Sequence, residues 1–323
     1  MSAFDQIAQK HHWTLKGEPT PLSGGFMHKM FKVDTDQGTY AIKLLNPFIM
    51  QRDTAMDNFM QAEQLETMLE NCGIPILPAL SVNGRKMQET DGQYYYIFEY
   101  FPGKALKTDE VTEFHCRQMG TALARIHKTD RKCESQSNCE MHIDWLFYLA
   151  RLKESNGQLY SLLKDTLPMI KSSQQNGNRA RKTLPPIAAV CHNDMDCKNV
   201  LWAGEDYRII DLECLSYSNP FMELFELALC WAGYEHSRID FSLFQAFLRG
   251  YRDAGGEMPQ DWETIYDCNN SRLEWLEYNI KRALGIDCGA DEKEIGIQQT
   301  EETIKQIRFY DSMKNDILKH CMI

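Results

Sequence analysis

The spacing of apolar residues changes once along the chain, near residue 102, and this change restricts the possible folds. Before it, short runs of β-branched and aromatic residues alternate with glycine-containing turns. Met30–Val33 and Thr39–Leu44 flank Asp36-Gln-Gly38, which predicts a hairpin. Leu80–Val82 and Tyr94–Phe98 predict a second hairpin, with turns at Asn83-Gly84 and Asp91-Gly92.

One helix is expected among these strands, and mainly helices after them. Apolar residues recur at helical spacing over 57–71, and Gly73 ends that pattern. After Pro102-Gly103, a candidate interdomain hinge, helices are predicted over 111–127 and 143–163. The polar stretch 171–183 is predicted to be a mobile loop, with a phosphate-binding arm as the alternative. This pattern indicates an α+β protein with a β-rich part, 1–101, and a larger helical part, 102–323.

Charge is distributed as unevenly as the secondary structure. The 323 residues include 46 acids and 35 bases, a net charge of −11, and all of this excess lies after residue 202. The acidic balance argues against nucleic acid or an anionic membrane as the main partner. It favours a cationic ligand if the acids face a pocket, or solvated helices if they do not.

Cysteine content and hydropathy bear on the cellular compartment. The 11 cysteines include no Cys-x-x-Cys pair, and they are interpreted as reduced thiols of a cytoplasmic protein. The first residues lack a basic segment followed by an apolar one, and no span approaches about 20 uncharged apolar residues. Neither a signal peptide nor a membrane helix is expected.

One stretch carries groups suited to phosphoryl transfer. Asp194 and Asn199 lie five residues apart, and Asp211 follows the short apolar pair Ile209-Ile210. A carboxylate such as Asp194 can orient an acceptor hydroxyl and take its proton, while Asn199 and Asp211 offer two oxygen ligands for Mg²⁺. His192 is interpreted as a buried residue that bonds to backbone. Asp196 and Lys198 form either an exposed pair or a phosphate contact.

The first hundred residues supply groups for a nucleotide. Lys43 lies on an apolar strand and needs an anionic partner, for which Glu63 is the candidate and Glu66 the alternative. Gly24-Gly25 would let backbone approach a phosphate, although most such pairs are plain turns. The backbone of Glu99–Phe101 would face an adenine edge, or belong to a core strand.

These residues together resemble the aminoglycoside phosphotransferase and choline kinase-like family. The resemblance rests on His192-Asn-Asp-Met-Asp-Cys-Lys-Asn199 with Ile210-Asp-Leu-Glu213, and extends over residues 20–280. It implies a protein-kinase-like fold that binds ATP and Mg²⁺, with GTP as an alternative nucleotide. It also implies that Asp194 is the catalytic base, that Asn199 and Asp211 are magnesium ligands, and that Lys43 binds phosphates.

Two departures from the family pattern are visible. Asn193 stands where glycine is usual, and Asp211-Leu-Glu213 replaces the Asp-Phe-Gly of protein kinases, so a small-molecule acceptor is favoured over a protein. Acids mixed with aromatic residues suit an amine-bearing acceptor, because aromatic faces attract cations. The candidate acceptor residues are Glu213, Glu223, Glu226, Trp231, Tyr234, Glu235, Asp240, Glu274, Trp275, Glu277 and Tyr278.

The leading hypothesis is therefore a kinase that phosphorylates a hydroxyl of an aminoglycoside-like or choline-like acceptor. A kinase acting on a neutral sugar or an amino-acid alcohol is an alternative. A catalytically silent nucleotide-binding module is another, although no essential group is missing. A metal-dependent hydrolase built on His192, Asp194, Asp196 and Asp211 would leave Lys43 unexplained.

Overall fold

A computed structural model describes residues 2–22, 28–133, 140–286, 288–289 and 292–323. The chain forms two compact units, each assembled from several segments. The first contains Met1–Val111, Arg125–Asp130 and Ala189–Tyr217, and the second contains Thr112–Ala124, Arg131–Ala188 and Ser218–Ile323. The predicted lobes 1–101 and 102–323 are continuous stretches, so their boundary stays a prediction.

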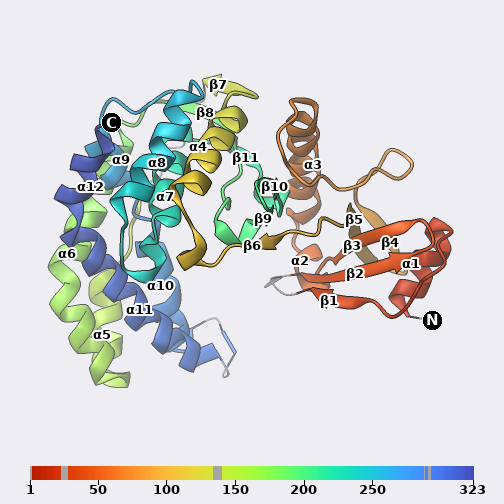
Figure 1. Ribbon diagram of the computed structural model, residues 1–323. Coiled ribbons are helices and arrows are strands. Elements are labelled where there is room, and N and C mark those ends of the chain that lie inside the picture. Colours follow the sequence, from red (N-terminus) through yellow and green to blue (C-terminus); the bar gives the residue numbers. More distant parts are fainter. Residues whose placement is uncertain (1, 23–27, 134–139, 287, 290–291) are drawn as a thin grey trace. The chain divides into compact units, whose positions relative to one another are not determined.

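The first unit is built around a five-stranded antiparallel sheet (Figure 1). Its order is β1-β2-β3-β5-β4, with bounds β1 Thr20–Leu22, β2 Lys29–Thr35, β3 Gly38–Leu44, β4 Gln88–Thr90 and β5 Gln93–Glu99. The predicted β2–β3 hairpin is confirmed, with Thr35 opposite Gly38. Lys43 lies on the central strand, opposite Met30 of β2 and Tyr96 of β5.

Both predicted glycine turns form, but one arm of the second hairpin is wrong. Asp91-Gly92 joins β4 to β5, and Asn83-Gly84 closes a smaller turn, each with two positive φ values. Leu80–Val82 is not a strand. The Leu80 amide donates to the Ile97 carbonyl at 2.7 Å, and the chain then leaves the sheet at Asn83-Gly84 before returning as β4.

The expectation of a single helix before residue 102 is also wrong. Two further helices occur there, α1 (Ala3–His11) and α2 (Pro47–Met50). Ser2 and Asp5 form a capping box at the start of α1, which buries Ile7 against the sheet. The serine–acid spacing is a recognisable sequence signal for α1, whereas four residues are too few to show a helical period for α2.

The predicted helix over 57–71 is confirmed as α3 (Ala55–Asn71). After it the chain lies along β10 (Asp206–Ile209), where Leu77 donates to the Ile209 carbonyl at 2.8 Å and Ile209 donates to the Pro75 carbonyl at 2.9 Å. These two bonds hold the strand that leads into Asp211 against the segment after α3.

A second sheet of the first unit has the order β10-β9-β6, with β6 at Lys104–Ala105 and β9 at Val200–Ala203. The segment predicted as a hinge, Pro102-Gly103, lies inside this unit. A Cβ at Gly103 would lie 2.4 Å from the Phe101 ring and 3.0 Å from the Trp202 carbonyl, so the chain is packed closely there. Short elements complete the first unit: η1 Thr108–Glu110, η2 Cys197–Asn199 and η3 Leu212–Cys214.

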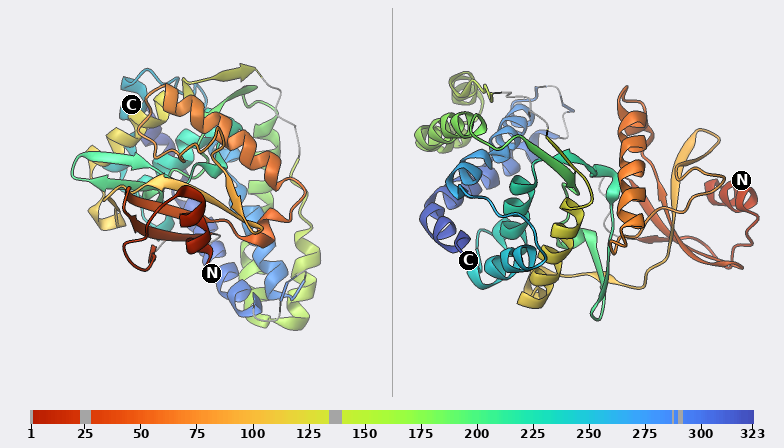
Figure 2. Two further views of the ribbon diagram at one scale, coloured as in Figure 1. Left: turned by 90° about the vertical axis from the view of Figure 1, so that its right-hand side faces the viewer. Right: turned by 90° about the horizontal axis from the view of Figure 1, so that it is seen from above.

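The second unit is mainly helical, and Figure 2 shows its helices from two further sides. The helix predicted over 111–127 is confirmed as α4. The remaining bounds are α4 Glu113–His127, β7 Arg131–Cys133, α5 Trp145–Ser155, α6 Gly157–Arg181, β8 Ile187–Cys191, β11 Ser216–Ser218, α7 Pro220–Trp231, η4 Tyr234–His236, α8 Phe241–Asp253, α9 Trp262–Cys268, α10 Ser271–Ala283, α11 Glu292–Ser312 and α12 Lys314–Cys321. No helix among the described residues is long and apolar enough to span a membrane.

Two predictions in this unit are corrected. The helix expected over 143–163 is split at Asn156, whose side chain accepts from the Leu159 amide and so begins α6. The stretch 171–183, predicted to be a loop, is mostly the end of α6. Its exposed side is polar, but Gly177 and Ala180 are buried, and Arg181 donates to Asn270 at 2.8 Å. One buried face is enough to hold a helix whose average composition is polar.

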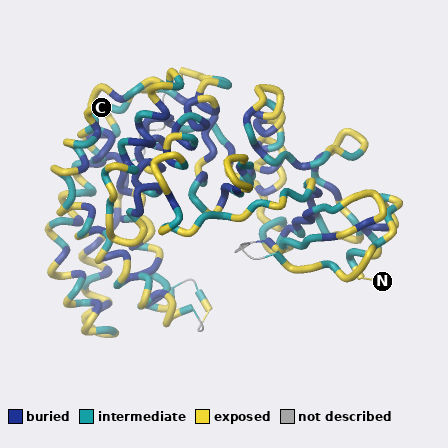
Figure 3. The backbone as a smooth tube through the Cα atoms, viewed as in Figure 1, coloured by how far each residue is buried: buried dark blue, intermediate teal, exposed yellow. Residues whose placement is uncertain are grey.

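The core of the second unit joins several of these helices, and Figure 3 shows buried stretches along them. Leu273 and Leu276 of α10 are buried with residues of α5, α6 and α11. Helices α4 and α8 approach through glycines. A Cβ at Gly120 would lie 2.0 Å from the Phe247 carbonyl oxygen, and a Cβ at Gly250 would lie 2.2 Å from the Arg117 carbonyl oxygen.

Candidate active site

The loop after β8 begins with a buried histidine. His192 has no exposed surface, and its Nε2 lies 3.1 Å from the Ile210 carbonyl oxygen. The Asp194 amide donates to His192 Nδ1 at 3.3 Å. Because that nitrogen accepts, the ring hydrogen is on Nε2 and is donated to Ile210. The predicted scaffold role of His192 is confirmed: its ring ties the loop to the residue before Asp211.

Asn193 adopts a left-handed conformation, with φ +63°. Glycine is favoured there because a Cβ is crowded at positive φ, and asparagine is the next most tolerant residue. The Asn193 side chain adds contacts that glycine lacks. Its Nδ2 lies 2.8 Å from the Cys214 carbonyl oxygen, 3.0 Å from Ser216 Oγ and 3.2 Å from the Cys191 carbonyl oxygen. It therefore ties the loop to the segment after Asp211.

Asn193 allows a separation of backbone strain from side-chain bonding. Asn193→Gly is expected to lower the free energy of unfolding by about 1 kcal/mol, because only the hydrogen bonds are lost. Asn193→Val is expected to cost about 1–2 kcal/mol more, because a β-branched residue is strained at positive φ. Urea unfolding of both variants checks this. Equal stabilities of the two variants would show that φ at this position is unimportant.

Asp194 and Asn199 are in direct contact. Asn199 is buried, and its Nδ2 donates to the Asp194 carboxylate at 2.8 Å and to the Asp194 backbone carbonyl at 2.7 Å. The Asn199 amide nitrogen is thereby used, so a cation would bind through its Oδ1. Burial raises the pKa of the Asp194 carboxyl, and Lys198 Nζ, 3.4 Å away, opposes the rise. A raised pKa makes Asp194 a stronger base.

Lys198 pairs mainly with Asp196. Their charged atoms lie 2.6 Å apart, and Asp196 also begins η2 by accepting from the Lys198 amide. The prediction of an exposed pair is confirmed for Lys198, whose side chain is 63% exposed, but Asp196 is largely covered at 15%.

Asp211 lies two residues after the end of β10 and also has a left-handed backbone, with φ +63°. The preceding residue, Ile210, donates its amide to the Asn199 carbonyl at 2.9 Å. This bond connects the Asp194–Asn199 loop to the strand that positions Asp211. Asn199 and Asp211, both predicted to hold magnesium, are thus connected by a backbone hydrogen bond between Asn199 and the residue before Asp211. Their carboxylate and amide oxygens are the ligand type that Mg²⁺ prefers, so the residues fit this ion.

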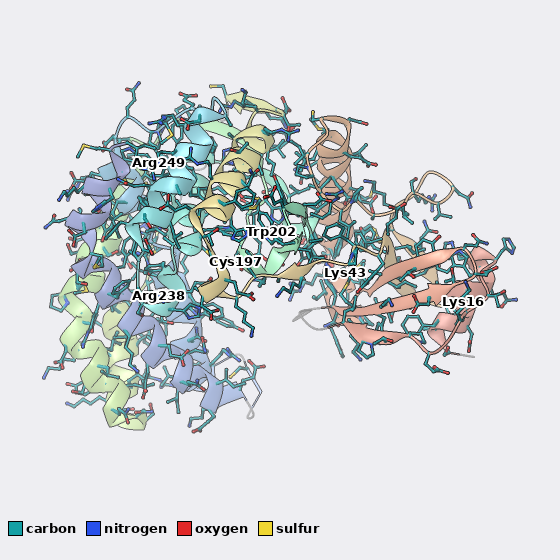
Figure 4. All side chains as sticks on the ribbon, in the orientation of Figure 1. Lys16, Lys43, Cys197, Trp202, Arg238 and Arg249 are labelled. Atoms are coloured by element: carbon teal, nitrogen blue, oxygen red, sulfur yellow. The ribbon has the colours of Figure 1, made fainter. Side chains whose placement is uncertain are left out.

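Lys43, labelled in Figure 4, lies on β3 and bonds to the same segment. Its Nζ lies 2.6 Å from Asp211 Oδ1 and 2.6 Å from Glu213 Oε2. Burial alone would lower the pKa of the Lys43 ammonium, but the Glu213 and Asp211 carboxylates raise it above its ordinary value. Burial alone would raise the pKa of Glu213, but its bonds to His28 and Lys43 lower it to about 2.

The predicted pair between Lys43 and an acid of α3 is not formed. Glu63 Oε1 accepts instead from the Tyr96 hydroxyl at 2.8 Å and from the Met87 amide at 3.1 Å. The alternative partner, Glu66, pairs with Lys86 at 2.7 Å and accepts from the Ala79 amide. Both α3 acids therefore bond to the segment over residues 79–96. Both acids have their hydrogen-bond partners in that segment, and Glu213 is the glutamate that pairs with Lys43.

A cavity of the first unit lies beside Lys43. Acids, a lysine and apolar side chains line it, most of them from α3, β3, β5 and η3: Lys43, Phe59, Ala62, Glu63, Glu66, Ala79, Tyr96, Phe98, Asp211, Leu212 and Glu213. Lys43, Asp211 and Glu63 thus share one cavity wall although only the first two are bonded.

The structure leaves the other predicted nucleotide-binding residues, Gly24, Gly25, Glu99 and Phe101, without a tested role. Gly24 and Gly25 lie outside the described residues. Glu99 is exposed at the end of β5, opposite Tyr40. The Phe101 ring is half-buried and lies 5.2 Å from the Arg208 guanidinium. Both stay predictions as adenine-facing residues.

The acceptor candidates separate into exposed and buried groups. Trp231 is 1% exposed in the core of the second unit, and its role as an acceptor ligand stays a prediction. Glu213 bonds to Lys43 and His28 in the first unit and does not belong to the helices of the second unit. Glu226 and Glu274 are exposed, and Tyr278 on α10 stacks with Trp275 at 5.4 Å between ring centroids. Glu277 accepts from the Tyr148 hydroxyl at 2.6 Å, and Asp240 caps α8. Glu223 is buried, whereas Tyr234 and Glu235 both lie in the short helix η4.

Sequence reasoning missed His28 and the role of Glu213. His28 Nε2 lies 3.2 Å from Glu213 Oε1, although 185 residues separate them in the sequence. A single histidine beside a glycine pair has no spacing that indicates a partner. An acid two residues after Asp211 was visible, but the sequence placed it equally well in an acceptor site.

Comparison with known proteins identifies related sequences. Residues 18–267 match the profile of the phosphotransferase enzyme family. Stress response kinase A of Escherichia coli K12 is 25% identical over 114 residues, which are 35% of this chain and 33% of that protein. A Salmonella typhimurium protein named serine/threonine protein kinase RdoA is 22% identical over 190 residues, 57% of this chain and 54% of that protein. The matches thus cover a third to about half of these relatives.

Solved structures share the fold. Spectinomycin phosphotransferase in complex with ADP and spectinomycin has a TM-score of 0.71 at 14% identity, covering 96% of this chain and 99% of that one. Amicoumacin kinase with AMP-PNP and Ca²⁺ has a TM-score of 0.62 at 14% identity, covering 94% of each chain. Plasmodium vivax ethanolamine kinase has 0.53 at 15% identity, covering 96% and 86%. The expected protein-kinase-like α+β fold is confirmed.

Proposed function

The chain belongs to the phosphotransferase enzyme family, and we propose that it transfers the γ-phosphate of ATP to a hydroxyl of a small, amine-bearing acceptor. One observation carries this proposal. Asp194 bonds to Asn199, Lys43 bonds to Asp211, and the Ile210–Asn199 backbone bond joins the two groups. A base, two oxygen ligands and a lysine are the parts that phosphoryl transfer requires.

Each residue has a distinct task in this proposal. Asp194 accepts a hydrogen bond from the acceptor hydroxyl and directs its oxygen toward the γ-phosphorus. It takes the hydroxyl proton as the new O–P bond forms, while the bond from the γ-phosphorus to the bridging oxygen of ATP breaks and ADP leaves. Asn199 keeps the Asp194 carboxylate oriented through its Nδ2. Asn199 Oδ1 and Asp211 would hold Mg²⁺, which supplies charge neutralisation at the phosphates when bound. Lys43 binds phosphate oxygens and leaves Asp211 to the metal.

The nucleotide and the acceptor are proposed separately. ATP fits the proposal because the spectinomycin phosphotransferase and amicoumacin kinase structures contain ADP and AMP-PNP. GTP is the alternative nucleotide, and the choice would depend on the backbone of Glu99–Phe101. For the acceptor, we favour the exposed face of α10, where Glu274 lies beside the stacked rings of Trp275 and Tyr278. A carboxylate and aromatic faces together suit an ammonium group.

A screen of acceptors tests this function directly. Purified protein with ATP and Mg²⁺ is assayed for ADP release with aminoglycosides, amicoumacin, choline, ethanolamine, amino-acid alcohols and neutral sugars. The proposal predicts turnover that depends on an acceptor carrying both a hydroxyl and an amine. Binding of ATP without turnover on any acceptor would instead support a silent nucleotide-binding module.

If the α10 face binds the acceptor, substitutions on it should raise the KM for whichever acceptor the screen identifies. Glu274→Gln with Tyr278→Leu is expected to raise the acceptor KM about tenfold and to leave the nucleotide KM unchanged, because one ion pair and one cation–π contact are lost. Glu294→Gln on α11 removes the same charge from an exposed helix and is the control. An unchanged acceptor KM in the double variant would exclude this face.

A protein acceptor is the second candidate. The Salmonella relative, which is named a serine/threonine protein kinase, favours it. Including a generic protein substrate and autophosphorylation in the same screen distinguishes the two candidates.

A further inference from the structure

The proposed chemistry gives no task to His28, which bonds to Glu213 beside Lys43. It lies directly before β2 and is 5% exposed. Its ring lies 6.2 Å from the Phe59 ring, between centroids, so it is packed inside the first unit. A buried imidazole requires hydrogen-bond partners. Both ring nitrogens have one.

The two partners determine which nitrogen carries the hydrogen. The Asn46 amide lies 2.9 Å from His28 Nδ1. A backbone amide can only donate, so Nδ1 accepts and the hydrogen is on Nε2. That hydrogen points to Glu213 Oε1, 3.2 Å away. His28 Nε2 therefore donates to the Glu213 carboxylate.

Asn46 is itself fixed by local structure. Its side chain accepts from the Phe48 amide and begins α2, where Pro47 occupies the first helical position. The imidazole is thus held by a helix start on one side. On the other side it holds Glu213. The carboxylate is divided between two donors, Oε1 to His28 and Oε2 to Lys43 at 2.6 Å.

A carboxylate with both oxygens bonded has a defined orientation. Without the bond to His28, Glu213 could rotate about its terminal torsion, which is broad for this side chain. Lys43 would then have no fixed anionic partner other than Asp211, the residue proposed to hold the metal. Glu63 and Glu66 cannot substitute without breaking their own bonds to Tyr96 and Lys86.

We propose that His28 is a positioning residue of the phosphate site, which acts through Glu213 to hold the Lys43 ammonium in place. This inference rests on the proposed function, since it requires that Lys43 binds nucleotide phosphates. It assigns to Glu213 and His28 the positioning of the lysine that the sequence pattern attributed to Glu63.

Binding of a fluorescent ATP analogue to the full chain, with Mg²⁺, tests the proposal without relying on turnover. His28→Leu is expected to weaken binding about tenfold, the effect of losing a hydrogen bond to a charged group. His28→Gln is expected to restore most of the affinity, because its amide can still donate to Glu213. If His28→Leu does not fold, His28→Asn replaces it, since its amide is too short to reach Glu213.

His11 provides a matched control. Its Nε2 lies 2.8 Å from the Tyr95 hydroxyl in the same unit, so His11→Leu also removes one partly buried histidine hydrogen bond. It is expected to leave nucleotide affinity unchanged. A double-mutant cycle with Glu213→Gln tests the route: His28→Leu should add less than twofold once Glu213 is neutral.

The outcomes separate this inference from the function on which it rests. Rescue by glutamine, together with loss of the His28→Leu effect in the Glu213→Gln background, supports it. If the wild type binds nucleotide and His28→Leu weakens binding no more than His11→Leu, positioning by His28 is overturned and the kinase function stands. If the wild type does not bind nucleotide, both are overturned.

Discussion

Asp194→Asn is expected to lower kcat for phosphoryl transfer by about 10²- to 10⁴-fold, the usual contribution of a general base. The amide keeps the shape of the side chain, and its oxygen can still accept from Asn199. It cannot take the acceptor's proton. Nucleotide affinity and the free energy of unfolding should therefore change little. Steady-state kinetics of ADP release, with binding of a fluorescent ATP analogue, measures both effects.

The control for this variant is Asp196→Asn. Asp196 lies two residues further along the same loop and pairs with Lys198, so the substitution removes an equal charge from the same loop. Its kcat should stay within about threefold of wild type, because Asp194 takes the proton and the asparagine side-chain oxygen at position 196 can still accept from the Lys198 amide. An Asp194→Asn enzyme as active as the wild type would rule out Asp194 as the base.

Lys43→Met is expected to weaken nucleotide binding at least about 30-fold, since truncating one partner of a buried charge pair costs about 2–5 kcal/mol. The substitution removes the phosphate-binding charge and leaves the Asp211 and Glu213 carboxylates without their shared cation. Titration with the fluorescent ATP analogue gives the change in dissociation constant. Thermal unfolding establishes that the variant is folded.

Lys86→Met is the matched comparison. Lys86 is also a buried lysine of the first unit, paired with Glu66 at 2.7 Å. Removing it leaves Glu66 buried with only the Ala79 amide, so we expect a loss of about 3–5 kcal/mol of stability. The affinity of the folded protein for nucleotide should not change. Equal effects of both substitutions on affinity would mean that Lys43 acts through stability alone.

The site shows where sequence reasoning is effective. Asp194 and Asn199 lie five residues apart on one loop, so their spacing alone allows contact, and the structure places them 2.8 Å apart. The β2–β3 hairpin was predictable for the same reason, because its turn and both strands are continuous in sequence. Local geometry also explains Asn193, whose tolerance of positive φ lets it occupy a glycine position.

The partner of Lys43 was not predictable in this way. Glu63, Glu66 and Glu213 are all acids of suitable charge, and nothing in their spacing ranks them. The choice depends on competing donors: the Tyr96 hydroxyl and the Met87 amide bond to Glu63, and Lys86 bonds to Glu66. Of these three acids, Glu213 is the one that bonds to Lys43, and its other oxygen bonds to His28.

The sequence by itself therefore determined which residues are candidates for the proposed chemistry: an acid, two further side chains with oxygen ligands and a lysine, on loops and strands that the sequence indicates. It also determined the change from strands to helices, because periodicity is a local property. The tertiary structure decided that Lys43 pairs with Glu213, 170 residues away in the sequence, and that the polar stretch after residue 170 continues α6. Those outcomes depend on burial and on competition for donors, and both exist only once the chain has folded.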